Sequence, residues 1–438
     1  MPRIVHLGFG NFHRAHQAWY TQLANNLDGE QWAITGVSMS RSDLRDALTS
    51  NGFQYSLGLR GVEGLEVQPM SAHDELLVAR LEPEAVIAAI AKPETQIVSL
   101  TITEKGYALD ASGRLDLDAS SIASDLKSDV PTSGVGLLTR GLWERSKSGA
   151  AVTVMCCDNL SGNGALLRQA VSDFAAASDW DMQSYLSEEV SFPDSMVDRI
   201  TPATTDVTIA EIAEVTGVSE PAPVITETFS EWVIEDHFAG ARPDWDKVGA
   251  VFTKDVTPFE ARKLRFLNGA HSLLAYGGLL RGYTYVHEAI GDPFLKQKVE
   301  ALWGEAVETL PTDFQPSCAA YCEALIARFE VPAIKHELRQ IAMDGTMKLP
   351  VRAIATAQVR AEKGQSSPAQ CDVLGSWLAR GLRSGVVDDP KAAELTELLH
   401  GKEPDDELFG AVLEALDWTE NFPFSTSDLL AATKAWLD

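Results

Sequence analysis

Three side chains that can hold or move a proton stand close together in one apolar segment, residues 263–271. On a helix with 100° per residue, Lys263, Asn268 and His271 project at about 0°, 140° and 80°, so one face carries all three. Two leucines fall in the same arc, which predicts a buried face. A lysine there needs a partner or a lowered pKa, because burial disfavours its charged form. Such an amine, beside an amide and an imidazole, is suited to taking a proton from an alcohol. The alternative is a lysine that reaches out to solvent, with Asn268 and His271 as satisfied core residues.

The start of this segment is marked by Thr257-Pro258-Phe259-Glu260. Threonine followed three residues later by glutamate is a capping-box pattern, and proline is favoured at the first helical position. The pattern predicts a helix over 258–276. Glu260 also falls on the Lys263 face, so a role as helix cap and a role as proton relay both stay open.

The elements that must position these residues follow two different patterns along the chain. In the first part, short apolar strands alternate with helical stretches, which predicts a largely parallel sheet. From about Asp246 onward, long helices dominate. We therefore expect an α/β protein with an N-terminal Rossmann-type doubly wound sheet (1–245) and a mainly α-helical C-terminal domain (246–438). The expected strands are 4–7, 32–38, 96–103 and 151–157, with helices at 15–24, 83–91 and 164–176, and later at 293–309, 317–329 and 389–399.

A glycine-rich turn follows the first expected strand. Gly8-Phe9-Gly10-Asn11-Phe12-His13-Arg14 resembles the fingerprint that lets backbone approach the pyrophosphate of a dinucleotide, although His13 replaces the usual third glycine or alanine. The second strand should end in an acidic residue that binds the ribose hydroxyls. The chain has Asp43 a few residues late, and Arg41 could pair with a 2′-phosphate. The choice between NAD and NADP therefore stays open.

Two further strands end in polar residues at the expected ligand edge of the sheet. One is followed by Thr103-Glu104-Lys105, and the next by Asp158-Asn159. Asn159 would supply an amide donor to a developing alkoxide. A charged turn in the first place, and turn or helix-entry residues in the second, are the structural alternatives.

Composition excludes several classes of partner. The 438 residues carry a formal net charge of −27, from 63 acidic and 36 basic residues, which disfavours nucleic acid and anionic membranes. The sequence contains no apolar run of 18 residues, so we expect no membrane span, and we expect no signal peptide ahead of the first strand. Five cysteines without zinc-like spacing are typical of a reduced, cytoplasmic protein, and we expect no metal. No tyrosine has lysine four residues on, so the dyad of short-chain dehydrogenases is absent.

Several motifs together carry a specific resemblance. They occur in the order GFGNFHRAH, TITEKGY, CDNLxxNG, SMVDRITP, WVIED and KLRFLNGAHS, and they span nearly the whole chain. In this order they resemble the mannitol dehydrogenase family of long-chain polyol-specific dehydrogenases. That family includes mannitol 2-dehydrogenases and fructuronate and tagaturonate reductases. The resemblance implies a Rossmann-type domain, a helical substrate domain, metal-independent catalysis and NAD(H) in most members.

The resemblance also implies residue roles. Lys263 resembles the family's general base, Asn159 and Asn268 its pair of oxygen-polarising amides, and His271 its substrate-orienting histidine. Lys348 resembles a substrate-binding lysine, but an arginine often found eight residues before it is Gln340 here, with Arg339 adjacent. The positions that resemble cofactor-contacting ones are Gly8, Gly10, Asn11, Phe12, Arg14, Val197 and Asp198, of which Asp198 also touches substrate, and to these we add Thr103, Glu104 and Lys105 from their place at the sheet edge.

The sequence thus predicts an NAD(H)-dependent oxidoreductase, with NADP(H) possible, that interconverts a polyol or sugar acid with its ketose or keto-uronate. Residues 268–271 are slightly closer to the fructuronate-reductase branch. We expect a small-molecule substrate and a monomer or small homo-oligomer. A catalytically inactive dinucleotide-binding sensor or scaffold is one alternative. A sugar-phosphate dehydrogenase, which would need basic residues clustered near His271, is another.

Overall fold

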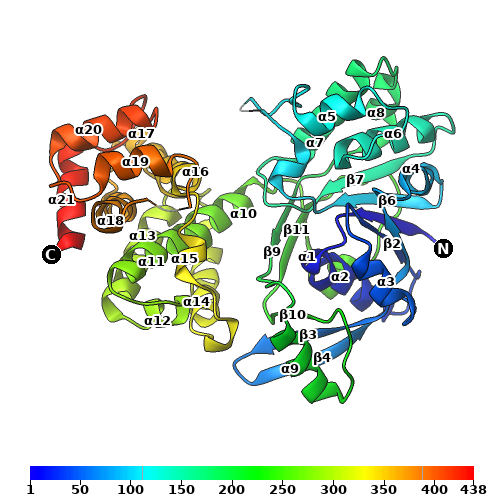
Figure 1. Cartoon of the computed structure of the whole chain (residues 1–438), viewed down its shortest axis with the longest axis horizontal. Coiled ribbons are helices and arrows are strands. Elements are labelled where there is room, and N and C mark those ends of the chain that lie inside the picture. Colours follow the sequence, from blue (N-terminus) through cyan, green and yellow to red (C-terminus); the bar gives the residue numbers. More distant parts are fainter. Residues whose placement is uncertain (111, 387) are drawn as a thin grey trace. The chain divides into compact units, whose positions relative to one another are not determined.

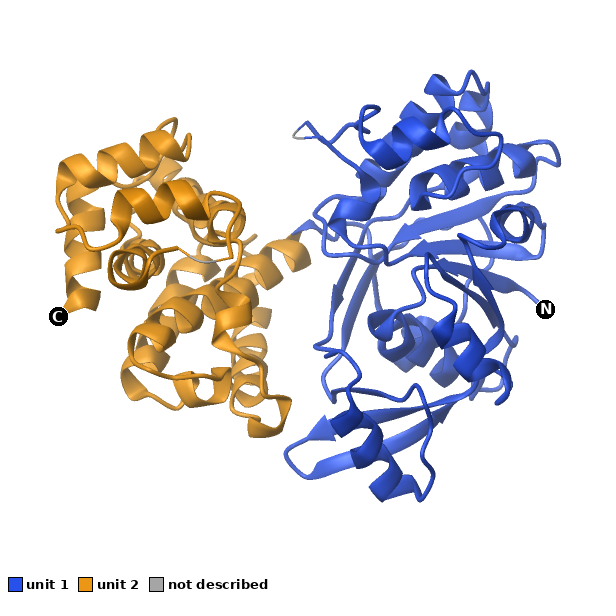
Figure 2. Ribbon diagram, viewed as in Figure 1, with its two compact units in different colours: residues 1–257 blue, residues 258–438 orange. Residues whose placement is uncertain are grey.

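The computed structural model describes residues 1–110, 112–386 and 388–438. These divide into two compact units, Met1–Thr257 and Pro258–Asp438 (Figure 2). The division falls 12 residues after the boundary we expected at 245/246. The reason is that strand β12 (Val251–Thr253) still pairs with β11 (Glu231–Glu235) of the first unit.

The first unit is built on a six-stranded parallel sheet with the order β5-β2-β1-β6-β7-β8. Strands β2, β6 and β7 of this sheet are labelled in Figure 1. The expected Rossmann-type fold is confirmed. The strand order reverses at β1, which lies between β2 and β6, and ligands of such sheets bind beside this point at the carboxyl ends of the strands. The strands are β1 (Arg3–Leu7), β2 (Ala33–Ser38), β5 (His73–Val78), β6 (Thr95–Leu100), β7 (Val152–Cys156) and β8 (Val190–Ser191).

Both faces of this sheet are covered, which explains why its strands read as nearly continuous apolar runs. Val5 and Leu7 of β1 pack with the helices that precede and follow β6 and β7, whereas Ile4 packs on the opposite face with Tyr20 and Trp232. The helices are α1 (Asn11–Ala15), α2 (Gln17–Asn25), α3 (Asp43–Thr49), α4 (Pro83–Ala91), α5 (Ser120–Asp125), α6 (Gly134–Ser146), α7 (Asn163–Ala177), α8 (Gln183–Glu188) and α9 (Asp206–Thr216).

Two three-stranded sheets complete the first unit. One has the order β10-β3-β4, formed by β10 (Val224–Glu227), β3 (Tyr55–Gly61) and β4 (Gly64–Met70). The other has the order β12-β11-β9, with β9 at Ser195–Asp198. Sequence periodicity did not predict β9 and β11 as strands; it yielded only their motifs.

The second unit is helical, as expected. No helix of the described residues is both long and apolar enough to cross a bilayer. The helices are α10 (Thr257–Arg262), α11 (Gly269–Leu280), α12 (Val286–Ile290), α13 (Pro293–Val307), α14 (Cys318–Phe329), α15 (Leu338–Ile341), α16 (Gly345–Leu349), α17 (Ala355–Glu362), α18 (Pro368–Ser384), α19 (Ala392–Leu399), α20 (Asp406–Ala415) and α21 (Thr426–Leu437).

Candidate dinucleotide and catalytic sites

Position 8, in the turn after β1, has room only for glycine. Gly8 has a φ of +104°, and a Cβ built there would lie 1.9 Å from the Thr101 carbonyl oxygen. The Thr101 hydroxyl also donates to the Gly8 carbonyl at 2.9 Å. The ends of β1 and β6 therefore meet backbone to backbone where the strand order reverses. This cradle fits the pyrophosphate of a dinucleotide, which needs close backbone approach.

The next residues of the loop differ in burial and in the contacts that they make. Gly10 is exposed, and Asn11 and Phe12 are half-buried. Arg14 is buried: its guanidinium donates to the Ala222 carbonyl and to Asn11 Oδ1, both at 2.6 Å. The Asn11 amide in turn donates to the Pro202 carbonyl at 3.0 Å. The buried Arg14 therefore stabilises the loop through its hydrogen bond to the Asn11 side chain.

A cluster of buried histidines supports the glycine turn, and sequence reasoning missed it. The two ring nitrogens of His6 lie 2.8 Å from the Ser99 and Thr101 hydroxyls. The His13 ring stacks on His6 with centroids 3.4 Å apart, and its Nε2 lies 2.9 Å from Nε2 of His73. The only available signal was a histidine inside an otherwise apolar strand.

This cluster makes the first unit sensitive to acid. Burial lowers the pKa of His6 and of His73 from about 6.5 to about 3, and that of His13 well below its usual value. Below pH 6.5 these histidines are protonated in the unfolded chain but stay neutral in the folded cluster. Stability is therefore complete above pH 6.5 and falls as the pH drops toward 3, by about 1.4 kcal/mol per pH unit for each such histidine.

We expect His73→Gln to lose less stability on acidification than the wild-type protein, by about one histidine's share. The measurement is the free energy of unfolding in urea at several pH values between 7 and 4.5. His237→Gln, at an exposed histidine of the same unit, is the control and should follow the wild-type slope. Equal slopes for all three proteins would contradict the prediction.

The loops after β6 and β7 are tied together by Asp158. Its carboxylate accepts from the Ile102 and Thr103 amides at 2.8 and 3.2 Å and from the Tyr107 hydroxyl at 2.7 Å. Burial raises the pKa of this carboxyl. Thr103 is held at a φ of +65°, a conformation that is strained for a β-branched residue and that clusters at functional sites.

Asp158 thus braces the edge of the sheet, while its neighbours face outward. Thr103, Glu104, Lys105 and Asn159 are all exposed. By contrast, Val197 and Asp198 of β9 are 5% and 4% exposed. These two pair in the strand with Trp232 and Glu231.

The two residues that we expect to select between NAD and NADP form an ion pair with each other. The Arg41 guanidinium forms an ion pair with Asp43 at 2.5 Å, and both side chains are exposed. The ion pair lowers the pKa of the Asp43 carboxyl and raises that of Arg41. A 2′-phosphate would meet the Asp43 carboxylate as well as the guanidinium, so Arg41 offers it little net attraction.

We therefore expect NAD(H) to be preferred and NADP(H) to be tolerated. We expect Asp43→Asn to shift the ratio of kcat/KM toward NADP(H) by about tenfold, because one charge-assisted hydrogen bond is worth about 1.5–3 kcal/mol. Steady-state kinetics with both cofactors and one substrate measure this. A wild-type preference of tenfold or more for NADP(H) would show that Arg41 dominates.

In the second unit, Lys263, Asn268 and His271 are buried on one continuous helical stretch. Their exposed fractions are 9%, 8% and 7%, which fits a buried base better than a lysine that reaches bulk water. The stretch starts at Thr257, whose amide donates to the Asp255 carboxylate at 2.9 Å. We expected a regular α-helix here, and this prediction was wrong. Residues 263–268 form a π-helical turn between α10 and α11.

Positive charge surrounds His271. Its ring lies 5.0 Å from Phe329 and 5.1 Å from His336, measured between centroids. Burial holds the pKa of His271 well below its usual value, and His336, Arg352, Arg328 and Lys348 lower it further. The imidazole is therefore neutral near pH 7.

Lys348 and the residues before it are placed on short helices. Lys348 lies on α16, half-buried, with its ammonium 3.3 Å from the Ile341 carbonyl. Arg339 and Gln340 lie on α15 and are both exposed. Arg328, at the end of α14, is a buried cation that sequence reasoning missed.

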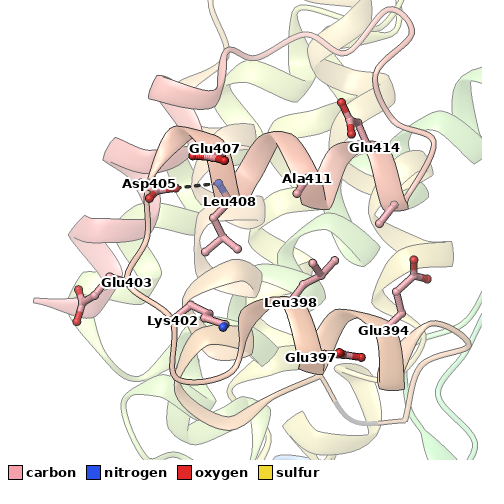
Figure 3. Close-up of a pocket in the computed structure, with 11 residues that line it drawn as sticks. Glu394, Glu397, Leu398, Lys402, Glu403, Asp405, Glu407, Leu408, Ala411 and Glu414 are labelled. Atoms are coloured by element: carbon pink, nitrogen blue, oxygen red, sulfur yellow. Dashed lines mark hydrogen bonds between the residues drawn. The ribbon is translucent and has the colours of Figure 1, made fainter.

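A hollow between α19 and α20 has the opposite charge. It encloses about 790 Å³, and its lining includes Glu394, Glu397, Glu403, Glu407 and Glu414 (Figure 3). An anion would be repelled there. Within the described ranges, no group of three or more His, Cys, Asp or Glu side chains is arranged to hold a metal ion.

A glycine-only turn at the reversal point of a parallel sheet, with a separate helical unit that buries a lysine, an asparagine and a histidine, defines a dinucleotide-dependent dehydrogenase. Comparison with known proteins agrees. Residues 2–247 match the mannitol dehydrogenase Rossmann domain, and residues 255–395 match the mannitol dehydrogenase C-terminal domain. The chain belongs to the mannitol dehydrogenase family, as its motifs indicated, and is an NAD-dependent polyol or sugar-acid dehydrogenase.

Individual relatives cover nearly all of the chain. D-mannonate oxidoreductase of Escherichia coli is 42% identical over 410 residues, which are 90% of this chain and 84% of the relative. Mannitol 2-dehydrogenase of Phaeosphaeria nodorum is 36% identical over 90% of this chain and 72% of its own. The ternary complex of Pseudomonas fluorescens mannitol 2-dehydrogenase with NAD and D-mannitol has a TM-score of 0.84 at 34% identity, covering 100% of this chain and 91% of the other.

Proposed function

We propose that this enzyme interconverts a sugar acid and its keto-uronate, using NAD(H), rather than a neutral polyol and its ketose. The observation that carries the proposal is the positive charge around His271. A relative 42% identical to the chain is a D-mannonate oxidoreductase, and mannonate carries a carboxylate.

The charge around His271 has a definite sign at neutral pH. Burial and the nearby Arg328 lower the pKa of His336 to about 4, so this ring is neutral. Arg328, Arg352 and Lys348 remain as the cations that depress the pKa of His271. Their positive charge attracts a substrate carboxylate. A neutral polyol has no charge for them to attract.

Within this proposal, the residues have distinct roles. Protonated Lys263 donates its proton to the substrate oxygen during reduction, and neutral Lys263 takes it back during oxidation. The amides of Asn159 and Asn268 stabilise negative charge on that oxygen. His271 orients the substrate as a neutral imidazole, and Lys348 binds its carboxylate, while Val197 and Asp198 contact nicotinamide and substrate. The nicotinamide cofactor, when bound, supplies or accepts the hydride.

The cofactor would be held mainly at the β1 turn and the neighbouring loops. Gly8 and Gly10 admit the pyrophosphate, and Asn11 and Phe12 flank it. Thr103, Glu104 and Lys105 are exposed at the adjacent strand end. Glu260, on α10, is either a helix cap or a relay for the Lys263 proton.

A sugar-phosphate dehydrogenase is the second candidate, because the same cations would attract a phosphate. A panel separates the two: NADH oxidation is followed with D-fructuronate, D-tagaturonate, D-fructose and D-fructose 6-phosphate. Turnover of a keto-uronate far above the others supports the proposal. Preference for fructose 6-phosphate would favour the second candidate, and failure to oxidise NADH with any member would favour an inactive dinucleotide-binding protein.

A further inference from the structure

The π-helical turn changes which way the site residues point. In a regular α-helix, Asn268 would project about 140° from Lys263. In the structure the Gly269 amide reaches back to the Leu264 carbonyl, five residues earlier, which is the π-helical pattern. The extra residue in the turn rotates all that follows back by roughly 100°. Asn268 then projects at roughly 40° and His271 at roughly −20°, so the three side chains fall within about 60° instead of 140°.

π-turns are rare and occur frequently at functional sites. Because a π-turn interrupts the regular hydrogen-bond ladder of the α-helix, contacts from other elements stabilise it. Two donors, the buried Trp303 and the half-buried Arg352, supply such contacts here. The Trp303 indole donates to the Phe266 carbonyl at 2.9 Å. Arg352 Nη1 donates to the Asn268 carbonyl at 3.4 Å and to the Ser272 hydroxyl at 3.1 Å.

The Arg352 backbone is also packed against the turn. A Cβ added at Gly269 would lie 3.3 Å from the Arg352 carbonyl oxygen and 3.4 Å from a Leu302 methyl. Arg352 itself lies in a second π-turn, Pro350–Ile354. Pro350 has no amide hydrogen to donate, which favours the irregular turn there. Two π-turns thus pack on each other, one with Lys263 and Asn268, the other with Arg352 just after Lys348.

We propose that Arg352 is a positioning residue, which with Trp303 holds the 263–268 turn in its π-helical form so that Lys263, Asn268 and His271 project together. The positioning effect of Arg352 is transmitted through the helix, because its Nη1 is bonded to the Asn268 carbonyl and to the Ser272 hydroxyl. Its charge also adds to the cations near His271. The catalytic consequence rests on the proposed function of Lys263. The structural consequence, a turn that depends on Arg352 and Trp303, does not.

Two variants test this. Trp303→Phe removes the indole donor without changing any charge, and Arg352→Met removes the guanidinium. We expect kcat to fall about tenfold in Trp303→Phe and about 10²-fold in Arg352→Met, since small displacements of catalytic groups have effects of this size. Arg352→Lys should recover part of the lost kcat. KM should stay nearly constant in Trp303→Phe, and we expect it to rise in Arg352→Met because a cation near His271 is lost.

The control is Arg360→Met, which removes a buried arginine of the same unit that is bonded to Ser366, Ser367 and Glu308 instead. Its melting temperature should fall while kcat is unchanged. Amide hydrogen exchange of the peptide spanning 263–272 should speed up in Trp303→Phe and Arg352→Met but not in Arg360→Met. Folded Trp303→Phe and Arg352→Met proteins with kcat within twofold of wild type and unchanged exchange would overturn the proposal. A wild-type protein without turnover would count against the proposed function alone, since the exchange result stands by itself.

Discussion

Lys263→Ala is expected to lower kcat by about 10²–10⁴-fold, the usual contribution of a positioned general acid or base. Lys263 is buried and lies on the same face as Asn268 and His271 once the π-turn is taken into account. Alanine at this position cannot exchange a proton with the substrate oxygen. Binding of NADH should survive, because the glycine turn that we propose as its site lies in the other unit. Stopped-flow measurement of a single turnover, alongside NADH fluorescence, separates the two effects.

A matched control for this variant is Lys254→Ala, which removes an exposed lysine nine positions earlier in the chain. It should retain wild-type kcat. If Lys263→Ala kept activity within a few-fold of wild type, another group would have to be the acid and base.

Lys348→Met is expected to lower kcat/KM for a keto-uronate by roughly 10- to 100-fold, which corresponds to the 1.5–3 kcal/mol of a charge-assisted hydrogen bond. Lys348 is among the cations that depress the pKa of His271, and in the proposed function its ammonium binds the substrate carboxylate. Most of the loss should be in KM, because the carboxylate is bound equally in the ground state and the transition state. With a neutral ketose the same variant should show little change.

Lys402→Met provides the comparison for charge alone. Lys402 is an exposed lysine of the same unit, at the acidic hollow between α19 and α20 (Figure 3). Its loss should leave kcat/KM for both sugars unchanged. Equal losses with keto-uronate and ketose in Lys348→Met would mean that Lys348 does not recognise the carboxylate.

The sequence predicted the parallel sheet well because alternation of apolar strands and helices depends on local patterns. Periodicity also predicted that Lys263, Asn268 and His271 share a buried face. It did not predict the π-turn, because an inserted residue in a helix leaves the apolar pattern nearly unchanged. The donors that support the turn, Trp303 and Arg352, lie far from it in sequence.

Other parts of the site depend on contacts that no local pattern encodes. The His6–His13–His73 cluster is assembled from two strands and a helix, and only the fold brings its rings together. Arg328 reaches the His271 region from α14, and no motif marks it. The sequence identified Arg41 and Asp43 as competing candidates for cofactor selection. Only the structure shows that they form an ion pair with each other.

The most direct test of the central claim is the ratio of kcat/KM for D-fructuronate and D-fructose, with NADH and the wild-type enzyme. These two sugars differ only in the group at C6, a carboxylate in one and a hydroxymethyl group in the other. The account predicts a ratio of at least about 10² in favour of fructuronate, the upper part of the range for one charge-assisted hydrogen bond. A ratio near one, or one that favours fructose, would contradict it.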